Sequence, residues 1–121
     1  MDIPENQIEE LRKIAPNLSI AQAGGFTFIL IEKLNLAEHL HNGCKPDVVD
    51  ALLCPMNRDG YESSLFFSSE LTGYPPKNPP RNWNNRRNVR ILDRNWFAIS
   101  WKVQAGLRLA EMFMIHLNAF R

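Results

Sequence analysis

Two cysteines are the only thiol nucleophiles in this sequence, and neither lies in a recognisable catalytic motif. Cys54 lies in the apolar run 52–55, where a cysteine is usually a small core residue. Cys44 follows an Asn-Gly pair and precedes Lys45, so we expect it to be exposed and its thiolate to gain from the lysine. A base beside the thiol is also needed, and His39 and His41 are close in sequence. Cys44 and Cys54 are therefore the candidate catalytic residues, although a lone thiol is usually inert.

Other catalytic chemistry has no signature in the chain. The sequence holds no G-x-S-x-G, no phosphate-binding glycine motif, no CxxC and no HxxxH. With three histidines in all, a structural zinc site is not expected. Two cysteines are too few for a disulfide framework and predict two free thiols in a reducing compartment. We expect no metal and no cofactor.

A basic segment is the strongest candidate for a binding surface. Residues 73–95 hold four prolines, six asparagines and six basic residues, and we expect a long loop over residues 71–95. Arginine and tryptophan are common anchors of protein interfaces. Arginine beside an aromatic side chain is also used by single-stranded nucleic acid grooves, but one exposed aromatic and no RNA-binding signature favour a protein partner. The predicted partner-binding residues are Lys77, Arg81, Trp83, Arg86, Arg87 and Arg90.

The charge of the chain divides sharply along its length. Residues 1–70 hold 11 acids and 5 bases, whereas residues 71–121 hold 2 acids and 9 bases. A basic face of this kind attracts an acidic partner. That partner is either another molecule or the acidic first half of this chain.

The hydrophobic pattern predicts one α+β domain over residues 1–121. We expect a helix over residues 4–14, a β-hairpin within 17–36 that turns at 23–25, and a short helical turn at 36–41. Strands are predicted at 48–54, apolar on both faces and hence buried, and at 64–68. An aromatic cluster at 96–101 follows the loop. A helix over 105–120 then presents an apolar face made of Leu107, Ala110, Phe113, Met114, Leu117 and Phe120.

The chain carries no sign of membrane insertion or export. Its longest apolar run, residues 26–31, has six residues, far short of a membrane span. The first residues carry acids where a signal peptide carries bases. We therefore expect a cytoplasmic protein with no membrane partner.

The order of these motifs resembles the ubiquitin-conjugating (UBC-like) fold across residues 5–120. In that family the third strand ends in a proline, a tyrosine-containing turn leads to the fourth strand, and a long active-site loop precedes a tryptophan and a helix. The matching stretches here are Leu53-Cys54-Pro55, Gly60-Tyr61, Leu65-Phe66-Phe67, residues 78–88, Val89-Arg90-Ile91-Leu92, Trp96 and residues 107–117. The tail is similar to the divergent bacterial branch, found beside bacterial ubiquitin-like proteins and their activating enzymes.

The sequence also departs from that family. No cysteine follows residue 54, so the expected catalytic position near residues 88–91 has none, and the His-Pro-Asn motif is missing. The resemblance thus implies a non-catalytic protein that binds a ubiquitin-like protein or its activating enzyme. One alternative is an active conjugating enzyme with a displaced nucleophile, Cys44 or Cys54. The other is a small nucleic-acid-binding module that uses the basic loop.

Overall fold

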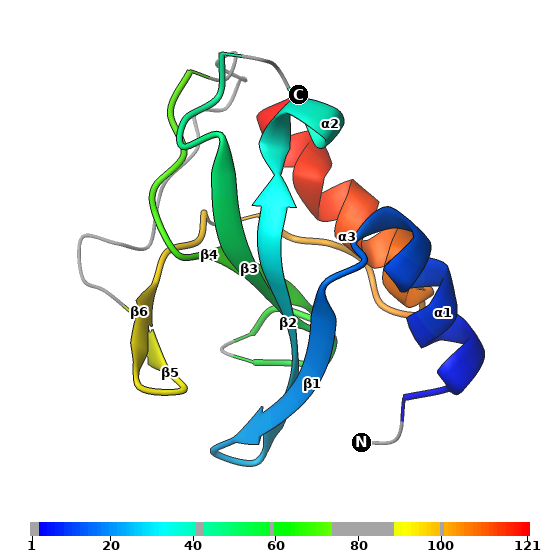
Figure 1. The fold of residues 1–121 in the computed structure, drawn as a ribbon. Helices are drawn as coiled ribbons and strands as arrows, with labels where there is room; N and C mark the ends of the chain where they lie inside the picture. The colour runs from blue at the N-terminus through cyan, green and yellow to red at the C-terminus, as the bar shows by residue number, and fades with distance from the viewer. Residues whose placement is uncertain (1–2, 41–42, 59, 74–88, 100) are drawn as a thin grey trace.

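The computed structural model describes residues 3–40, 43–58, 60–73, 89–99 and 101–121. In these residues the chain forms an N-terminal helix, a four-stranded antiparallel sheet, a two-stranded hairpin and a C-terminal helix (Figure 1). This confirms the α+β class. The elements are α1 (Glu5–Ile14), β1 (Leu18–Ala23), β2 (Phe26–Asn35), α2 (Leu36–His39), β3 (Val48–Cys54), β4 (Ser64–Phe67), β5 (Val89–Ile91), β6 (Arg94–Trp96), α3 (Leu109–Leu117) and a 3-10 turn at Asn118–Phe120.

The main sheet has the simple order β1-β2-β3-β4, so each strand pairs with its neighbour in sequence. The predicted hairpin is present and turns at Gly24 and Gly25, whose φ angles are 58° and 82°. Two successive residues with positive φ form the tight turn that suits the twist of paired strands, and glycine adopts it without strain.

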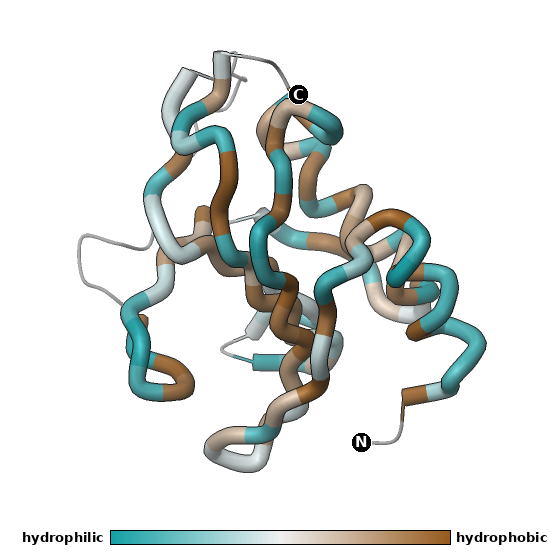
Figure 2. The backbone as a smooth tube through the Cα atoms, viewed as in Figure 1, coloured by the Kyte–Doolittle hydropathy of each residue, from teal (hydrophilic) through white to brown (hydrophobic). Residues whose placement is uncertain are grey.

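Side chains alternate along each strand, so the sheet contributes to two cores, one on each face. On β3, Val49, Ala51 and Leu53 join a core that includes Leu11 of α1 and Phe113 of α3. Leu52 and Cys54 of β3 join a second core on the opposite face, whose members are Phe28, Leu52, Cys54, Phe66, Ile91, Trp96 and Ala98. Figure 2 shows the strongest hydrophobic colouring along these central strands. The prediction that β3 is buried on both faces is confirmed for residues 51–54, whereas Val48 is exposed and Asp50 is half-buried.

The C-terminal helix begins at Leu109, four residues later than predicted. Gln7 Oε1 accepts from the Leu109 backbone N–H at 3.2 Å, and Arg108 holds Glu10 of α1 through two hydrogen bonds of 2.9 Å. These contacts fasten the start of α3 to α1. The predicted apolar face was partly wrong, because Ala110 and Met114 are only half-buried, while the helical side chains buried are Leu109, Met112, Phe113, His116 and Leu117.

The predicted loop over residues 71–95 is wrong at its C-terminal end, where β5 and β6 form a hairpin. The turn between them has Leu92 and Asp93 at φ 54° and 59°. Such turns usually contain glycine or asparagine, and the one common turn residue here is Asp93, which does not indicate a hairpin by itself. Among the described residues, none of the helices has the length and apolar character that crossing a membrane requires.

Candidate functional site

Cys54 is a buried core residue, as predicted. Its exposed fraction is 0%, and its Sγ lies 3.6 Å from the Met56 carbonyl oxygen. Burial raises the pKa of the Cys54 thiol, so the reactive thiolate is disfavoured. The position therefore suits packing rather than nucleophilic attack.

Cys44 is also buried, with 1% exposure, so the expectation of an exposed thiol is wrong. The neighbouring Lys45 pairs through its backbone with Thr72, at 2.8 and 2.9 Å, which lays this segment against residues 71–73. The Lys45 ammonium bonds Asp47 at 2.7 Å. The Asn-Gly pair suggested a surface turn, but pairing with a segment 27 positions away decides the burial.

The two histidines near Cys44 in sequence were the expected source of a catalytic base, and the structure describes only His39. The His39 ring packs edge-on against Phe113, with ring centroids 6.0 Å apart. His41 lies outside the described residues. Within the part of the chain that the structure describes, no hydrogen bond joins Cys44 to His39, so the two form no nucleophile–base pair.

Most of the predicted partner-binding segment lies outside the described residues. This applies to Lys77, Arg81, Trp83, Arg86 and Arg87. Arg90 is described, and it lies exposed in the middle of β5. The structure therefore describes only the C-terminal end of this segment, which lies on the face of the sheet opposite the helices.

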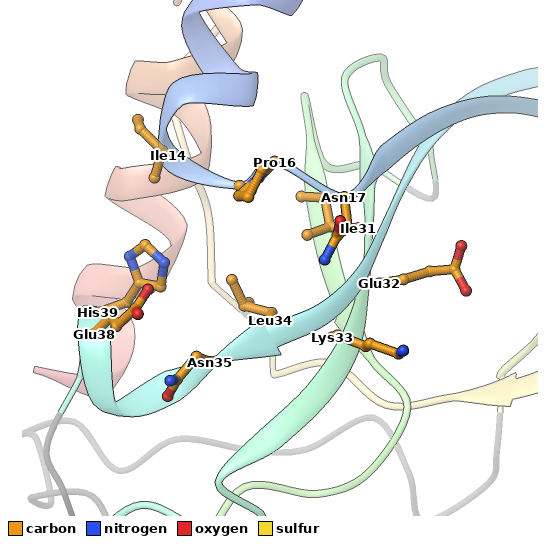
Figure 3. Close-up of a pocket in the computed structure, with 11 residues that line it drawn as sticks. Ile14, Pro16, Asn17, Ile31, Glu32, Lys33, Leu34, Asn35, Glu38 and His39 are labelled. Atoms are coloured by element: carbon orange, nitrogen blue, oxygen red, sulfur yellow. The ribbon is translucent and has the colours of Figure 1, made fainter.

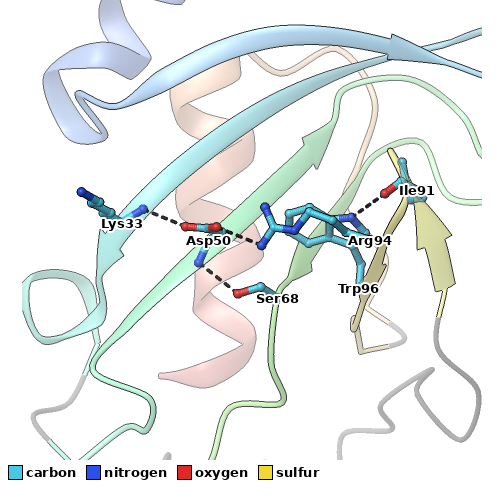
Figure 4. Close-up of polar contacts among 6 residues, drawn as sticks. All are labelled: Lys33, Asp50, Ser68, Ile91, Arg94 and Trp96. Carbon is cyan, nitrogen blue, oxygen red and sulfur yellow. Dashed lines mark hydrogen bonds and ion pairs between the residues drawn. The ribbon is translucent and has the colours of Figure 1, made fainter.

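Asp50 fastens this hairpin to the sheet (Figure 4). The Arg94 guanidinium donates to one Asp50 carboxylate oxygen at 2.9 Å, and the Lys33 backbone N–H donates to the other at 3.0 Å. Partial burial alone would raise the Asp50 pKa, but these two donors hold it below its usual value. Asp50 is thus a charged anchor. It neutralises Arg94, one of the basic residues of the stretch 71–121, within the molecule.

The Asp50 anchor depends on a bulge in β2. Ile31 pairs with Ala51 and Leu34 pairs with Val49, so Glu32 and Lys33 together lie opposite Asp50. Lys33 has φ 52°, an uncommon conformation for a residue with a side chain. The carboxylate of Asp50 accepts the Lys33 N–H at this irregular position, and the Ser68 hydroxyl oxygen accepts the Asp50 N–H at 3.1 Å. One aspartate therefore joins the bulge, the end of β4 and the hairpin.

Trp96 anchors the other side of the hairpin. It is fully buried, and its indole N–H donates to the Ile91 carbonyl oxygen at 2.9 Å. The Arg94 guanidinium lies over the Trp96 ring, 4.7 Å from its centroid. Arg94 is therefore held from two directions, whereas Arg90 remains exposed on the same hairpin.

A pocket of about 210 Å³ lies between the end of α1, the bulge and α2 (Figure 3). Apolar side chains such as Ile14, Ile31 and Leu34 line it, with Glu38 and His39 at one end. In Figure 3 the side chains of Glu32 and Lys33 point away from His39, so the charged groups do not converge. No group of three or more metal-ligating side chains occurs within the part of the chain that the structure describes.

A buried polar pair was missed by sequence reasoning. Ser63 Oγ lies 2.8 Å from His116 Nε2, and the two residues are 1% and 5% exposed. Burial lowers the pKa of His116 to about 4, so the ring is neutral at pH 7. Ser63 is almost inaccessible to solvent, so this pair is not placed to act as a catalytic nucleophile and base.

The chain has no significant match among protein-family models, curated proteins or solved structures.

Proposed function

We propose that this chain is a ubiquitin-conjugating-enzyme-like protein of a bacterial ubiquitin-like conjugation pathway that binds its partner without forming a thioester. The partner is a ubiquitin-like protein or its activating enzyme. The order of elements supports this proposal: a helix, a four-stranded antiparallel sheet, a segment ending in a buried tryptophan, and a C-terminal helix. The same order carries the sequence resemblance.

The burial of both thiols is the observation that carries the proposal. Thioester formation needs a thiolate that an incoming carbonyl carbon can reach. Cys44 and Cys54 are 1% and 0% exposed, and the Cys54 pKa is raised. This opposes the alternative in which one of them is a displaced nucleophile.

The basic segment over residues 77–94 is the proposed binding surface. Its last part is the β5–β6 hairpin, which Asp50 and Trp96 hold on the sheet. A surface held on a rigid support loses less conformational entropy on binding than a free loop. Because Arg94 is already paired, we assign partner contact to Arg86, Arg87 and Trp83, and to the exposed Arg90.

Partner capture tests this surface. The probes are a bacterial ubiquitin-like protein and an activating enzyme of that pathway type. Replacing Arg86 and Arg87 together by alanine should leave the melting temperature unchanged, weaken capture and flatten its salt dependence, because charge steering is screened over about 10 Å at 0.1 M salt. The matched control replaces Arg12 and Lys13 of α1, which removes the same charge elsewhere.

Three outcomes would contradict the proposal. If the Arg86/Arg87 variant melts lower but binds normally, these arginines belong to an internal charge network. If incubation with activating enzyme, ubiquitin-like protein and ATP gives an adduct that a thiol reductant removes, the chain is an active conjugating enzyme. If oligonucleotides bind with a steep salt dependence and the protein partners do not bind, the nucleic-acid alternative is correct.

A further inference from the structure

The outer edge of β1 is the open edge of the main sheet. At the opposite edge, the backbone of Phe67 in β4 exchanges hydrogen bonds of 2.7 and 2.8 Å with Phe97, so that edge is partly covered. No described residue pairs with the outer side of β1. Ser19, Ile20 and Gln22 are exposed, so neither helix covers this stretch.

This edge lacks the usual protection against strand pairing. Exposed edge strands normally carry lysines, prolines or bulges that discourage contact with another strand. Residues 17–25 contain no charged residue and no proline, and β1 pairs with β2 in continuous register. Ile20 is 46% exposed, which makes it one of two exposed large hydrophobic side chains among the residues that the structure describes. Val48, at the start of β3, is the other.

The hydrogen-bonding pattern of β1 is symmetric about Ile20. The Glu32 N–H donates to the Asn17 carbonyl oxygen at 2.9 Å, so residue 17 directs its backbone groups toward β2. Because this direction alternates along an antiparallel strand, residues 19, 21 and 23 also bond to β2. The N–H and C=O groups of Leu18, Ile20 and Gln22 therefore point outward.

We propose that the outer edge of β1 pairs with β1 of a second copy of this chain, antiparallel, about a two-fold axis at Ile20. In this register Leu18 lies opposite Gln22 of the other copy, and the two Ile20 residues lie opposite each other. All the outward backbone groups are then paired. No like charges meet, and small Ser19 and Ala21 side chains face each other on the other side of the sheet.

The resulting dimer is a weak one. Two six-residue strands that meet edge to edge bury less surface than the roughly 1,200–2,000 Å² of a stable interface. We expect a dissociation constant between about 1 µM and about 1 mM. The contact is isologous, so it stops at two copies and joins two four-stranded sheets into one. The dimer contact does not involve the basic segment over residues 77–94, so its test does not depend on the proposed function.

Sedimentation equilibrium between about 10 µM and about 1 mM protein tests the proposal. The wild-type chain should shift from monomer to dimer as concentration rises. Ile20→Lys places two ammonium groups at the axis and should leave the protein monomeric throughout, as should Ile20→Glu. An equimolar mixture of the two variants should associate again, because opposite charges then meet. Val48→Lys is the matched control and should dimerise like the wild type.

A second measurement needs no variant. Amide hydrogen exchange at Leu18, Ile20 and Gln22 should slow as concentration rises, while exchange at Ser19 and Ala21, already bonded to β2, stays constant. The proposal is overturned if the wild type remains monomeric at about 1 mM, if the three amides show no concentration dependence, or if Ile20→Lys dimerises as strongly as the wild type.

Discussion

Ser63 Oγ and His116 Nε2 lie 2.8 Å apart in the interior, although 53 positions separate the two residues in sequence. Ser63 immediately precedes β4, and His116 lies in the last turn of α3. The hydrogen bond satisfies a polar group that the helix brings into its apolar face. Burial disfavours protonation of the ring, because little water is present to stabilise a charged imidazolium.

The first prediction is a loss of stability in mild acid. The His116 pKa is about 4 in the folded protein and near 6.5 in the unfolded chain, so the unfolded chain binds more protons between these values. Stability is therefore complete above pH 6.5 and falls as pH decreases toward 4. For these two pKa values, the free energy of unfolding should drop by about 2 kcal/mol between pH 7 and pH 5. Urea unfolding at both pH values measures it.

The double variant Ser63→Ala, His116→Leu is the control for this effect. It removes the titrating ring without leaving the serine hydroxyl unpaired, so most of the drop between pH 7 and pH 5 should disappear. A smaller slope should remain, since partial burial also lowers the pKa of His39. Asp50 has a lowered pKa as well, but its contribution is lost at more acidic pH. An unchanged pH dependence in the double variant would show that His116 is not the group responsible.

The second prediction concerns the thiols. Both cysteines are buried, so a thiol reagent should label them slowly in the native protein and rapidly in denaturant. Cys54→Ala should lower the free energy of unfolding by about 1 kcal/mol or more through lost packing and leave partner binding intact. Rapid native labelling at Cys54, located by mass spectrometry, would contradict its role as a core residue.

The main sheet could be predicted because its signals are local. The Gly24-Gly25 turn marks the first hairpin, and the apolar run from residue 48 to 54 indicates a strand buried on both faces. The burial of Cys44 could not be predicted, because it depends on the pairing of its neighbour Lys45 with Thr72. The predicted apolar face of the C-terminal helix and its buried stripe share only Phe113 and Leu117. The stripe that is buried contains His116, which a search for apolar residues omits.

The candidate site was less predictable for the same reason. The basic residues were evident from composition, but Asp50 and Arg94 are 44 positions apart, and nothing in the sequence pairs them. Each is an ordinary charged residue by itself. Their contact depends on the bulge at Lys33 and on a hairpin whose turn lacks glycine, and both features arise from tertiary packing.

The third prediction tests the Asp50–Arg94 contact. The two side chains are 26% and 42% exposed, so solvent weakens the ion pair, and a double-mutant cycle with alanine should give a coupling energy of about 0.5–1 kcal/mol. Asp50→Ala should cost more than Arg94→Ala, because it also leaves the Lys33 N–H without its acceptor. Equal costs with no coupling would show that the hairpin is held by Trp96 alone.

The last prediction concerns the packing of α3 on the sheet. Phe113 is fully buried among residues of α1, β2, β3 and β4, and its ring meets the His39 ring edge-on. Phe113→Ala leaves a cavity that rigid strands cannot fill, so it should lower the free energy of unfolding by about 3–5 kcal/mol. That is a large share of the total for a domain of this size, and the melting temperature should fall sharply. Met114→Ala, on the neighbouring half-buried position, is the matched control and should cost clearly less. If both variants lose the same stability, the buried stripe of the helix includes Met114 rather than running through His116.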